Sequence, residues 1–189
     1  MEINALLAVI LCGGASRRMG TDKGLMPIGD TIRAKYVANK LEPFQLPLVF
    51  SVNEKQVSDY AVHISPDQLI TDSVDAHGPL NGLLSVHKQS PLNNLLLLSC
   101  DLLDLDENTI TDMLEAYQAE TDHEFIVYQD VEYAQPFCGI YTSAGLAKLM
   151  ERMQTHRLHS FSLQSVLNEG NTLRLGISNA RAFANYNLS

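Results

Sequence analysis

Apolar runs of strand length recur along this chain. The runs are Leu6–Leu11, Pro47–Val52, Leu95–Ser99, Phe125–Tyr128 and Phe137–Tyr141. Several of them are apolar on both faces, a pattern typical of parallel strands that have helices on each side. Because parallel neighbours need a long crossover connection, usually a helix, helices are expected in the intervals between these runs.

The intervals carry helical periodicity. Helices are predicted over Thr31–Leu41, Leu80–His87, Glu107–Ala119 and Ser143–Gln154. The third follows Asp104 and Asp106, and the fourth follows Thr142 or Ser143, side chains that can cap free backbone N–H groups. Asp104 and Asp106 also invite a two-metal interpretation, but we interpret them as the start of the helix. The alternation predicts an α/β fold, a Rossmann-like three-layer sandwich with a mainly parallel sheet.

The length of the chain fits one domain. With 189 residues and no internal repeat or flexible linker, residues 1–189 are expected to form a single domain. The 13 basic and 22 acidic side chains give a net charge of -9, which argues against a nucleic-acid or anionic membrane surface. No apolar run approaches the roughly 20 residues that span a bilayer. The three cysteines form no Cys-x-x-Cys pair, so we expect no disulfide framework or structural zinc, and a cytoplasmic location.

A glycine-containing loop follows the first apolar run directly. Gly13 and Gly14 let the backbone approach an anion closely, and Ser16 adds a hydroxyl donor. Sheets of this kind bind ligands at the carboxyl ends of their strands, which is where Leu11 and Cys12 lead into the loop. We predict that residues 11–23 hold the triphosphate of a nucleotide.

Basic side chains in the same stretch supply the charge that phosphates require. Arg17, Arg18 and Lys23 would neutralise charge that builds up during phosphoryl transfer, so Lys23 and Arg17 are the candidate catalytic cations. Neither the Gly-x-Gly-x-x-Gly dinucleotide pattern nor the Gly-x-x-x-x-Gly-Lys-Ser/Thr P-loop is present. The structural alternative is a glycine turn with solvated basic residues.

A carboxylate stands at the end of another predicted strand. Asp101 follows the buried run Leu95–Ser99 and Cys100, and a strand-end carboxylate of this kind can hold Mg²⁺ together with substrate phosphates. Asp101 is therefore the candidate metal ligand and a candidate catalytic and nucleotide-binding residue. The alternative is an Asp that caps a helix or a turn.

Residues 11–25 resemble the signature of the molybdenum cofactor guanylyltransferases, which join GMP from GTP to molybdopterin. The resemblance implies a fold of the nucleotide-diphospho-sugar transferase type. Cys12 stands where that family usually has Ala. Cys100-Asp101 is similar to the family's metal-binding Cys-Asp, although Leu102 and Leu103 follow where the family commonly has a Pro.

The resemblance implies three more nucleotide contacts. Asn53 corresponds to the second Asn of an Asn-x-Asn pattern near the guanine nucleotide, and Ser51 replaces the first. Asp72 is similar to an Asp proposed to contact the nucleotide. Gly78 opens a Gly-Pro-Leu-x-Gly segment, where exposed backbone N–H groups suit an anion or a base edge and where simple helix initiation is an equal reading.

Two segments in the C-terminal half resemble the family with departures. Gln135-Pro136 is similar to a His-Pro segment on the expected pterin side, and Gln135 excludes a catalytic His there. Residues 183–187 are similar to Phe-x-Asn-x-Asn, with Asn185 and Asn187 able to close over the site. The helix that follows in most members is not expected here.

The resemblance implies an enzyme that transfers GMP from GTP to the terminal phosphate of Mo-molybdopterin and releases pyrophosphate. Mg²⁺ is the implied cofactor, and molybdenum insertion proteins or target molybdoenzymes are the implied protein contacts. One alternative is a cytidylyltransferase or a sugar-phosphate nucleotidyltransferase with the same loop. An alternative from another class is a non-catalytic nucleotide-binding accessory module.

Overall fold

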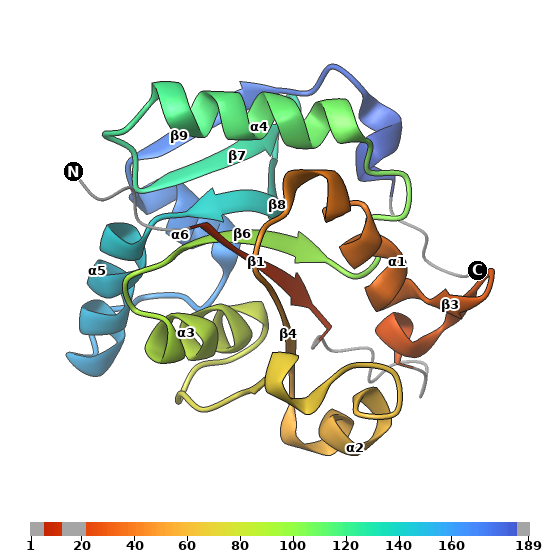
Figure 1. Cartoon of the computed structure of the whole chain (residues 1–189). Helices are drawn as coiled ribbons and strands as arrows, with labels where there is room; N and C mark the ends of the chain where they lie inside the picture. Colours follow the sequence, from red (N-terminus) through yellow and green to blue (C-terminus); the bar gives the residue numbers. More distant parts are fainter. Residues whose placement is uncertain (1–5, 13–21, 185–189) are drawn as a thin grey trace.

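A seven-stranded sheet runs through the centre of the computed structural model, which describes residues 6–12 and 22–184 (Figure 1). Its strand order is β5-β4-β1-β6-β8-β7-β9. The strands are β1 (Leu6–Leu11), β4 (Leu48–Val52), β5 (Leu69–Thr71), β6 (Asn94–Ser99), β7 (Phe125–Gln129), β8 (Ala134–Tyr141) and β9 (Thr172–Gly176). A separate two-stranded sheet pairs β2 (Pro27–Ile28) with β3 (Thr31–Ile32).

Most strand pairs in the large sheet are parallel. β1 pairs in parallel with β4 and β6, β4 with β5, and β7 with β9. β8 runs antiparallel to both of its neighbours, β6 and β7. Only residues 130–133 join β7 to β8, which leaves no room for a crossover helix and makes the pair a hairpin. The prediction of a mainly parallel sheet is confirmed.

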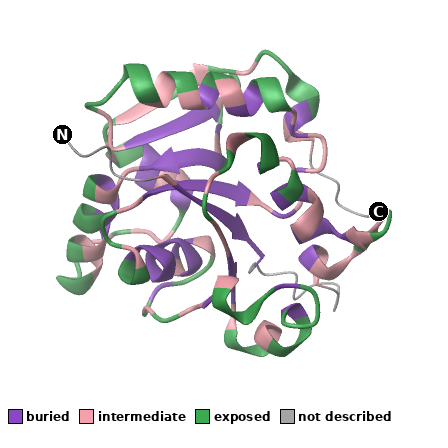
Figure 2. Ribbon diagram, viewed as in Figure 1, coloured by how far each residue is buried: buried purple, intermediate pink, exposed green. Residues whose placement is uncertain are grey.

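Helices cover both faces of the sheet. They are α1 (Arg33–Asn39), α2 (Val57–Tyr60), α3 (Pro79–Gln89), α4 (Glu107–Ala119), α5 (Ser143–Gln154) and α6 (Leu163–Glu169). Ala8 and Ile10 of β1 share one core cluster with α1 and α4, whereas Leu7 and Val9 share the other with α3, α5 and α6. Successive residues of a strand therefore point into opposite layers, and Figure 2 shows the strands buried between the helices. The three-layer sandwich is confirmed.

Side-chain caps begin the two helices whose predicted bounds are those of the structure. Asp106 Oδ1 accepts a hydrogen bond from the Thr109 N–H at 2.8 Å at the start of α4. Thr142 Oγ1 accepts one from the Gly145 N–H at 3.1 Å at the start of α5. These caps satisfy N–H groups that the first helical turn leaves without a partner. The interpretation of Asp106 as the start of a helix is confirmed.

The predicted helix Thr31–Leu41 is wrong at its beginning. Thr31 and Ile32 form β3, and α1 begins only at Arg33. Gly29 takes a positive φ of 55° in the turn between β2 and β3, which places the two β-branched residues in a small hairpin. The helical periodicity continues through them because Ile32 is buried on the same side as the residues of α1.

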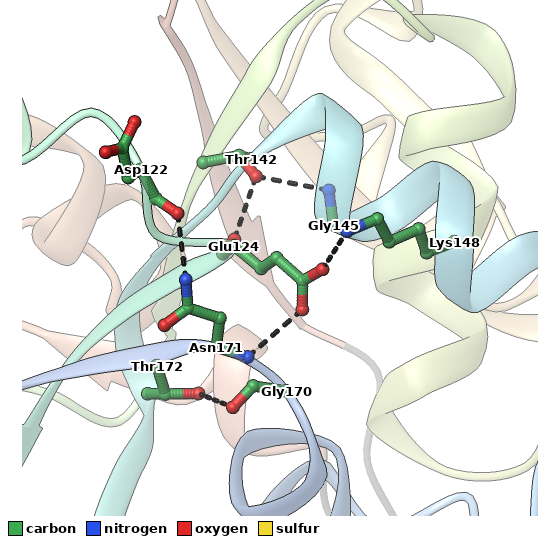
Figure 3. Close-up of polar contacts among 8 residues, drawn as sticks. All are labelled: Asp122, Glu124, Thr142, Gly145, Lys148, Gly170, Asn171 and Thr172. Carbon is green, nitrogen blue, oxygen red and sulfur yellow. Dashed lines mark hydrogen bonds and ion pairs between the residues drawn. The ribbon is translucent and has the colours of Figure 1, made fainter.

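A polar network fastens the amino-terminal edge of the sheet (Figure 3). Glu124 precedes β7, and its carboxylate forms an ion pair with Lys148 of α5 and accepts a hydrogen bond from the Asn171 N–H at 3.1 Å. The Glu124 carbonyl accepts from Thr142 Oγ1 at 2.9 Å. These donors hold the pKa of Glu124 below its ordinary value, with the Lys148 hydrogen bond as the largest cause. The network joins β7, α5 and the start of β9, and it lies at the opposite edge from the carboxyl ends of the parallel strands.

None of the helices within residues 6–12 and 22–184 is both long and apolar enough to cross a membrane.

Candidate active site

The parallel strands bring four of their carboxyl ends to one edge of the sheet. In the register, Leu11 lies opposite both Ser51 of β4 and Ser99 of β6, and Val52 lies opposite Thr71 of β5. The residues that follow these ends include the predicted Cys12, Asn53, Asp72 and Asp101. These residues and Leu11, which come from four separate parts of the sequence, therefore lie along one edge of the sheet, the edge toward which the arrows of β1 and β6 point in Figure 1.

Lys23 and Asp101 form an ion pair at this edge. Lys23 begins a short 3-10 helix, η2 (Lys23–Leu25), and its Nζ lies 3.3 Å from Asp101 Oδ2. The other carboxylate oxygen, Oδ1, accepts a hydrogen bond from Ser99 Oγ at 2.5 Å. The side chains of Lys23 and Asp101 are 34% and 21% exposed, so a ligand can reach both charges. The structure thus brings together a cation that can meet phosphate and a carboxylate that can meet a metal.

The carboxylate of Asp22 is held by donors from three places. Its Oδ1 accepts from the Gly24 N–H and from the Tyr60 hydroxyl, both at 2.9 Å, and its Oδ2 accepts from Gln56 Nε2. Asp22 is thereby the N-cap of η2, the helix that begins with Lys23. The sequence analysis selected none of Asp22, Gln56 and Tyr60 as site residues. The signal present was the position of Asp22 directly before Lys23, but two of its three donors, Gln56 and Tyr60, lie more than 30 positions later in the sequence.

The thiols at this edge are buried and protonated. Cys12 and Cys100 follow neighbouring strands, and the Cys100 N–H donates to the Leu11 carbonyl at 3.3 Å. Burial raises the pKa of Cys12 well above its ordinary value, and burial together with Asp101 raises the pKa of Cys100 to about 12. Since a thiol attacks only as the thiolate, these cysteines act in packing and not as nucleophiles.

Asn53 caps a second 3-10 helix, η4 (Glu54–Gln56). Its side-chain oxygen accepts from the Lys55 N–H at 3.0 Å, and its own N–H donates to Gln56 Oε1 at 2.9 Å. Asn53 therefore stands at the predicted edge with its carboxamide oxygen engaged in the cap. Ser51, the position of the first Asn in the family pattern, is 1% exposed. A Cβ on Gly82 of α3 would lie 2.4 Å from Ser51 Oγ, so the close approach of α3 leaves Ser51 no route to a ligand.

Asp72 and Gly78 flank the loop between β5 and α3. Asp72 is half-buried, and burial raises its pKa. Gly78 precedes Pro79, the first residue of α3, with a positive φ of 64° and open space where a Cβ would be. The helix-initiation reading of Gly78 is confirmed, and its exposed backbone remains available for the predicted nucleotide contact.

Several predicted residues lie outside the described part of the chain. These are Gly13, Gly14, Ser16, Arg17 and Arg18 of the loop, and Asn185 and Asn187 near the C-terminus.

Three other residues considered in the sequence analysis are described. Gln135 lies at the start of β8, which begins at the carboxyl edge of the parallel strands because β8 is antiparallel to β6. Asp104 forms an ion pair with Arg181 at 3.1 Å, and Asp106 accepts from Asn179, so both carboxylates serve the local structure.

The donor set at the edge fits a metal that arrives with phosphates. Within residues 6–12 and 22–184, no group of three or more His, Cys, Asp or Glu side chains is arranged to hold a metal ion. Asp101 is one accessible carboxylate, and Mg²⁺ in proteins commonly takes one or two carboxylates and completes its shell with water and substrate phosphates. Asp101 therefore suits Mg²⁺ only together with a phosphate ligand.

The sequence of this chain matches a known protein family. The family described as "MobA-like NTP transferase domain" matches residues 8–171. The molybdenum cofactor guanylyltransferase of Shewanella baltica (strain OS155 / ATCC BAA-1091) is 32% identical over 132 residues, which are 68% of this chain and 65% of that protein. The match thus spans just under two thirds of the relative's length.

Solved structures share the fold. Molybdopterin-guanine dinucleotide biosynthesis protein A from Archaeoglobus fulgidus superposes with a TM-score of 0.71 at 17% identity, covering 94% of this chain and 86% of that one. A protein of Mycobacterium tuberculosis H37Rv, solved in complex with manganese, has a TM-score of 0.64 at 14% identity. The superposition covers 92% of this chain and 88% of the Mycobacterium chain. At these identities the likeness is one of fold, of the nucleotide-diphospho-sugar transferase type.

Proposed function

Because this chain belongs to the family of MobA-like NTP transferase domains, we propose that it is an enzyme that transfers GMP from GTP to the terminal phosphate of Mo-molybdopterin. The observation that carries the proposal is the pairing of Lys23 with Asp101 at the carboxyl edge, where α/β sheets bind their ligands. The molybdenum cofactor guanylyltransferase of Shewanella baltica, 32% identical over 68% of this chain, supports the choice of donor and acceptor.

The proposed reaction transfers GMP by substitution at one phosphorus atom. An oxygen of the acceptor's terminal phosphate attacks the α-phosphorus of GTP, and the bond from that phosphorus to the bridging oxygen breaks. Pyrophosphate leaves with the electron pair of that bond. The acceptor supplies its own nucleophile, so the protein contributes positioning and charge stabilisation.

Each site residue has a role in this scheme. Lys23 and Arg17 neutralise charge on the triphosphate, and the backbone of Gly13 and Gly14 with the Ser16 hydroxyl cradles it. Leu11 and Cys12 lead the chain from β1 into this cradle, with the Cys12 N–H engaged by the Ser51 carbonyl at 2.9 Å. Asp101 would hold Mg²⁺, which would offset the charge of the phosphates. Asn53, Asp72 and Gly78 border the base and ribose. The engaged oxygen of Asn53 leaves its amide N–H groups as the donors for such a contact.

The setting of the reaction is part of the proposal. The free cysteines of the described chain, Cys12, Cys100 and Cys138, are all buried, which suits a reducing cytoplasm. The finished cofactor would pass to molybdenum insertion proteins or target molybdoenzymes.

Base choice is the sharpest test of this proposal. Pyrophosphate release is measured from GTP, CTP and ATP separately, each with Mg²⁺ and with or without Mo-molybdopterin. We expect release from GTP alone, and only when the pterin is present. Preference for CTP would assign the chain to the cytidylyltransferases instead, and binding of nucleotide with no release would assign it to a non-catalytic accessory module.

A further inference from the structure

The Asp22 side chain has an unusual number of donors for a residue next to a lysine. Both of its oxygens accept hydrogen bonds, Oδ1 from the Gly24 N–H and the Tyr60 hydroxyl, and Oδ2 from Gln56 Nε2. Hydrogen bonds to a charged acceptor are roughly twice as strong as neutral ones. The carboxylate of Asp22 is therefore fixed, and it is turned toward Tyr60 and Gln56.

The Tyr60 hydroxyl donates a hydrogen bond to Asp22. The side chain is fully buried in the core beside α1 and carries its hydroxyl to Asp22 at 2.9 Å. Burial raises the pKa of Tyr60 far above its ordinary value, so it remains a hydrogen-bond donor. A Cβ on Gly24 would lie 2.0 Å from the Tyr60 hydroxyl oxygen, so the glycine permits η2 to lie directly on it.

Gln56 joins the segments that meet at the site. Its Nε2 donates to the Cys12 carbonyl at 3.3 Å as well as to Asp22, and its Oε1 accepts from the Asn53 N–H at 2.9 Å. One side chain thus contacts the end of β1, the end of β4 and the residue that caps η2. Its three contacts fix the place of η2 relative to the two strand ends.

These contacts set the direction of Lys23. Lys23 is the first residue of η2, and the N-cap of that helix is Asp22. With both Asp22 oxygens engaged, Lys23 Nζ lies next to Asp101 Oδ2, 3.3 Å away, across the edge of the sheet. A short 3-10 helix has little stability of its own, so its orientation depends on the cap.

We propose that Tyr60 and Gln56 are positioning residues that act through Asp22 to hold Lys23 at the phosphate-binding edge. The inference rests on the proposed function, because it assigns Lys23 to the transferred phosphates. Tyr60 and Gln56 do not touch the substrate; they set where the Lys23 charge stands when phosphate arrives.

A double-mutant cycle tests this role against a merely structural one. Tyr60→Phe removes only the hydroxyl, and we expect it to lower kcat for GMP transfer about tenfold while KM for GTP changes little. In the Lys23→Ala background, measured by single turnover, the same substitution should have no further effect, because the residue that it positions is gone. An equal loss in both backgrounds, or no loss in the wild-type background, overturns the proposal.

Tyr128→Phe is the matched control. Tyr128 is another buried tyrosine of the same core cluster, and its hydroxyl donates to the Thr109 carbonyl of α4 at 2.7 Å. It lies in β7, which β6 and β8 separate from β1. We expect removal of the Tyr128 hydroxyl to lower the free energy of unfolding and to leave kcat unchanged. Gln56→Met is the second variant, should Tyr60→Phe fail to fold, and the same non-additivity with Lys23→Ala is expected.

A measurement without turnover separates this inference from the proposed function. Lysines are labelled by reductive ¹³C-methylation, and the Lys23 signal is assigned from its absence in Lys23→Arg. In Tyr60→Phe that signal should move toward the positions of unrestrained lysines, and in Tyr128→Phe it should stay. An unmoved signal in Tyr60→Phe overturns the positioning role even if GMP transfer is confirmed, and a moved signal supports it even if the chain proves to use another nucleotide.

Discussion

At the scale of single residues, Arg33 has more buried polar side-chain atoms without a hydrogen-bond partner than any other residue within 6–12 and 22–184. It is 9% exposed on the face of α1 that packs against the sheet, beside Ala34 and Val37. Its Nε and Nη1 are buried, and neither has a hydrogen-bond partner within the described residues. A guanidinium has five N–H donors and no acceptor, so other groups must supply the acceptors. Burial of a charge without partners is unfavourable for folding.

Arg33→Met should therefore stabilise the protein. The substitution keeps the length and flexibility of the side chain and removes the buried charge, and we expect the free energy of unfolding to rise by about 1 kcal/mol or more. Urea denaturation followed by circular dichroism measures the change. Lys35→Met, two residues along the same helix, is the control for loss of a positive charge and should be nearly neutral. Destabilisation by Arg33→Met would show that the guanidinium has a stabilising partner.

Individual candidate site residues could be predicted from the sequence where the residue type and its position after a strand are enough to indicate a role. Lys23 and Asp101 could be predicted because a basic residue after a glycine loop and a carboxylate after a buried strand each have few other uses at a strand end. Asp22, Gln56 and Tyr60 could not, since their significance lies in hydrogen bonds between segments more than 30 positions apart. Asn53 was selected as a nucleotide contact, and the cap that occupies its oxygen depends on Gln56 and Lys55, which the pattern does not reveal.

At the scale of elements, the long buried strands and helices follow from hydrophobic pattern. β1, α4 and α5 have the predicted bounds because a continuous apolar run or a capped amphipathic segment admits one structure. β5 has three residues, β9 lies at the sheet edge with alternate residues exposed, and α6 has seven residues. Such short or half-exposed elements are stabilised by their neighbours, and local pattern does not predict them.

The packing of α5 on β7 depends on one glycine. A Cβ on Gly145 would lie 2.9 Å from the Glu124 carbonyl oxygen and 2.9 Å from a ring carbon of Phe125, and the carbonyl is backbone that accepts from Thr142 (Figure 3). The helix must therefore move away from the strand to admit a methyl group.

Gly145→Ala should destabilise the protein. Overpacking costs about 1 to 3 kcal/mol, and the higher helix propensity of Ala offsets only about 1 kcal/mol of it, so we expect a net loss of up to about 2 kcal/mol in urea denaturation. Gly176→Ala is the matched control, because a Cβ there meets nothing within 4 Å. Equal stability of the two variants would contradict the tight packing of α5 on β7.

At the scale of the whole molecule, the two edges of the sheet carry different kinds of polar residues. The amino-terminal edge is closed by Glu124 and its partners, which join β7, α5 and β9 (Figure 3). At the carboxyl edge, the partly exposed charges of Lys23 and Asp101 meet beyond the end of β6. Tyr60 and Gln56, which follow β4, contact Asp22 beside Lys23. This separation keeps the Glu124–Lys148 ion pair away from the phosphates that the proposed reaction handles.

Asp101 at the carboxyl edge is proposed to hold the Mg²⁺ that GMP transfer requires, and the Mg²⁺ dependence of transfer in Asp101 variants tests this role. GMP transfer to Mo-molybdopterin is followed with radiolabelled GTP over a range of Mg²⁺ concentrations in the wild type, in Asp101→Asn and in Asp112→Asn, an exposed carboxylate of α4. We expect a loss of transfer on the order of 100-fold or more in Asp101→Asn, with an unchanged fold by circular dichroism, and normal transfer in Asp112→Asn. Full Mg²⁺-dependent transfer by Asp101→Asn would contradict it.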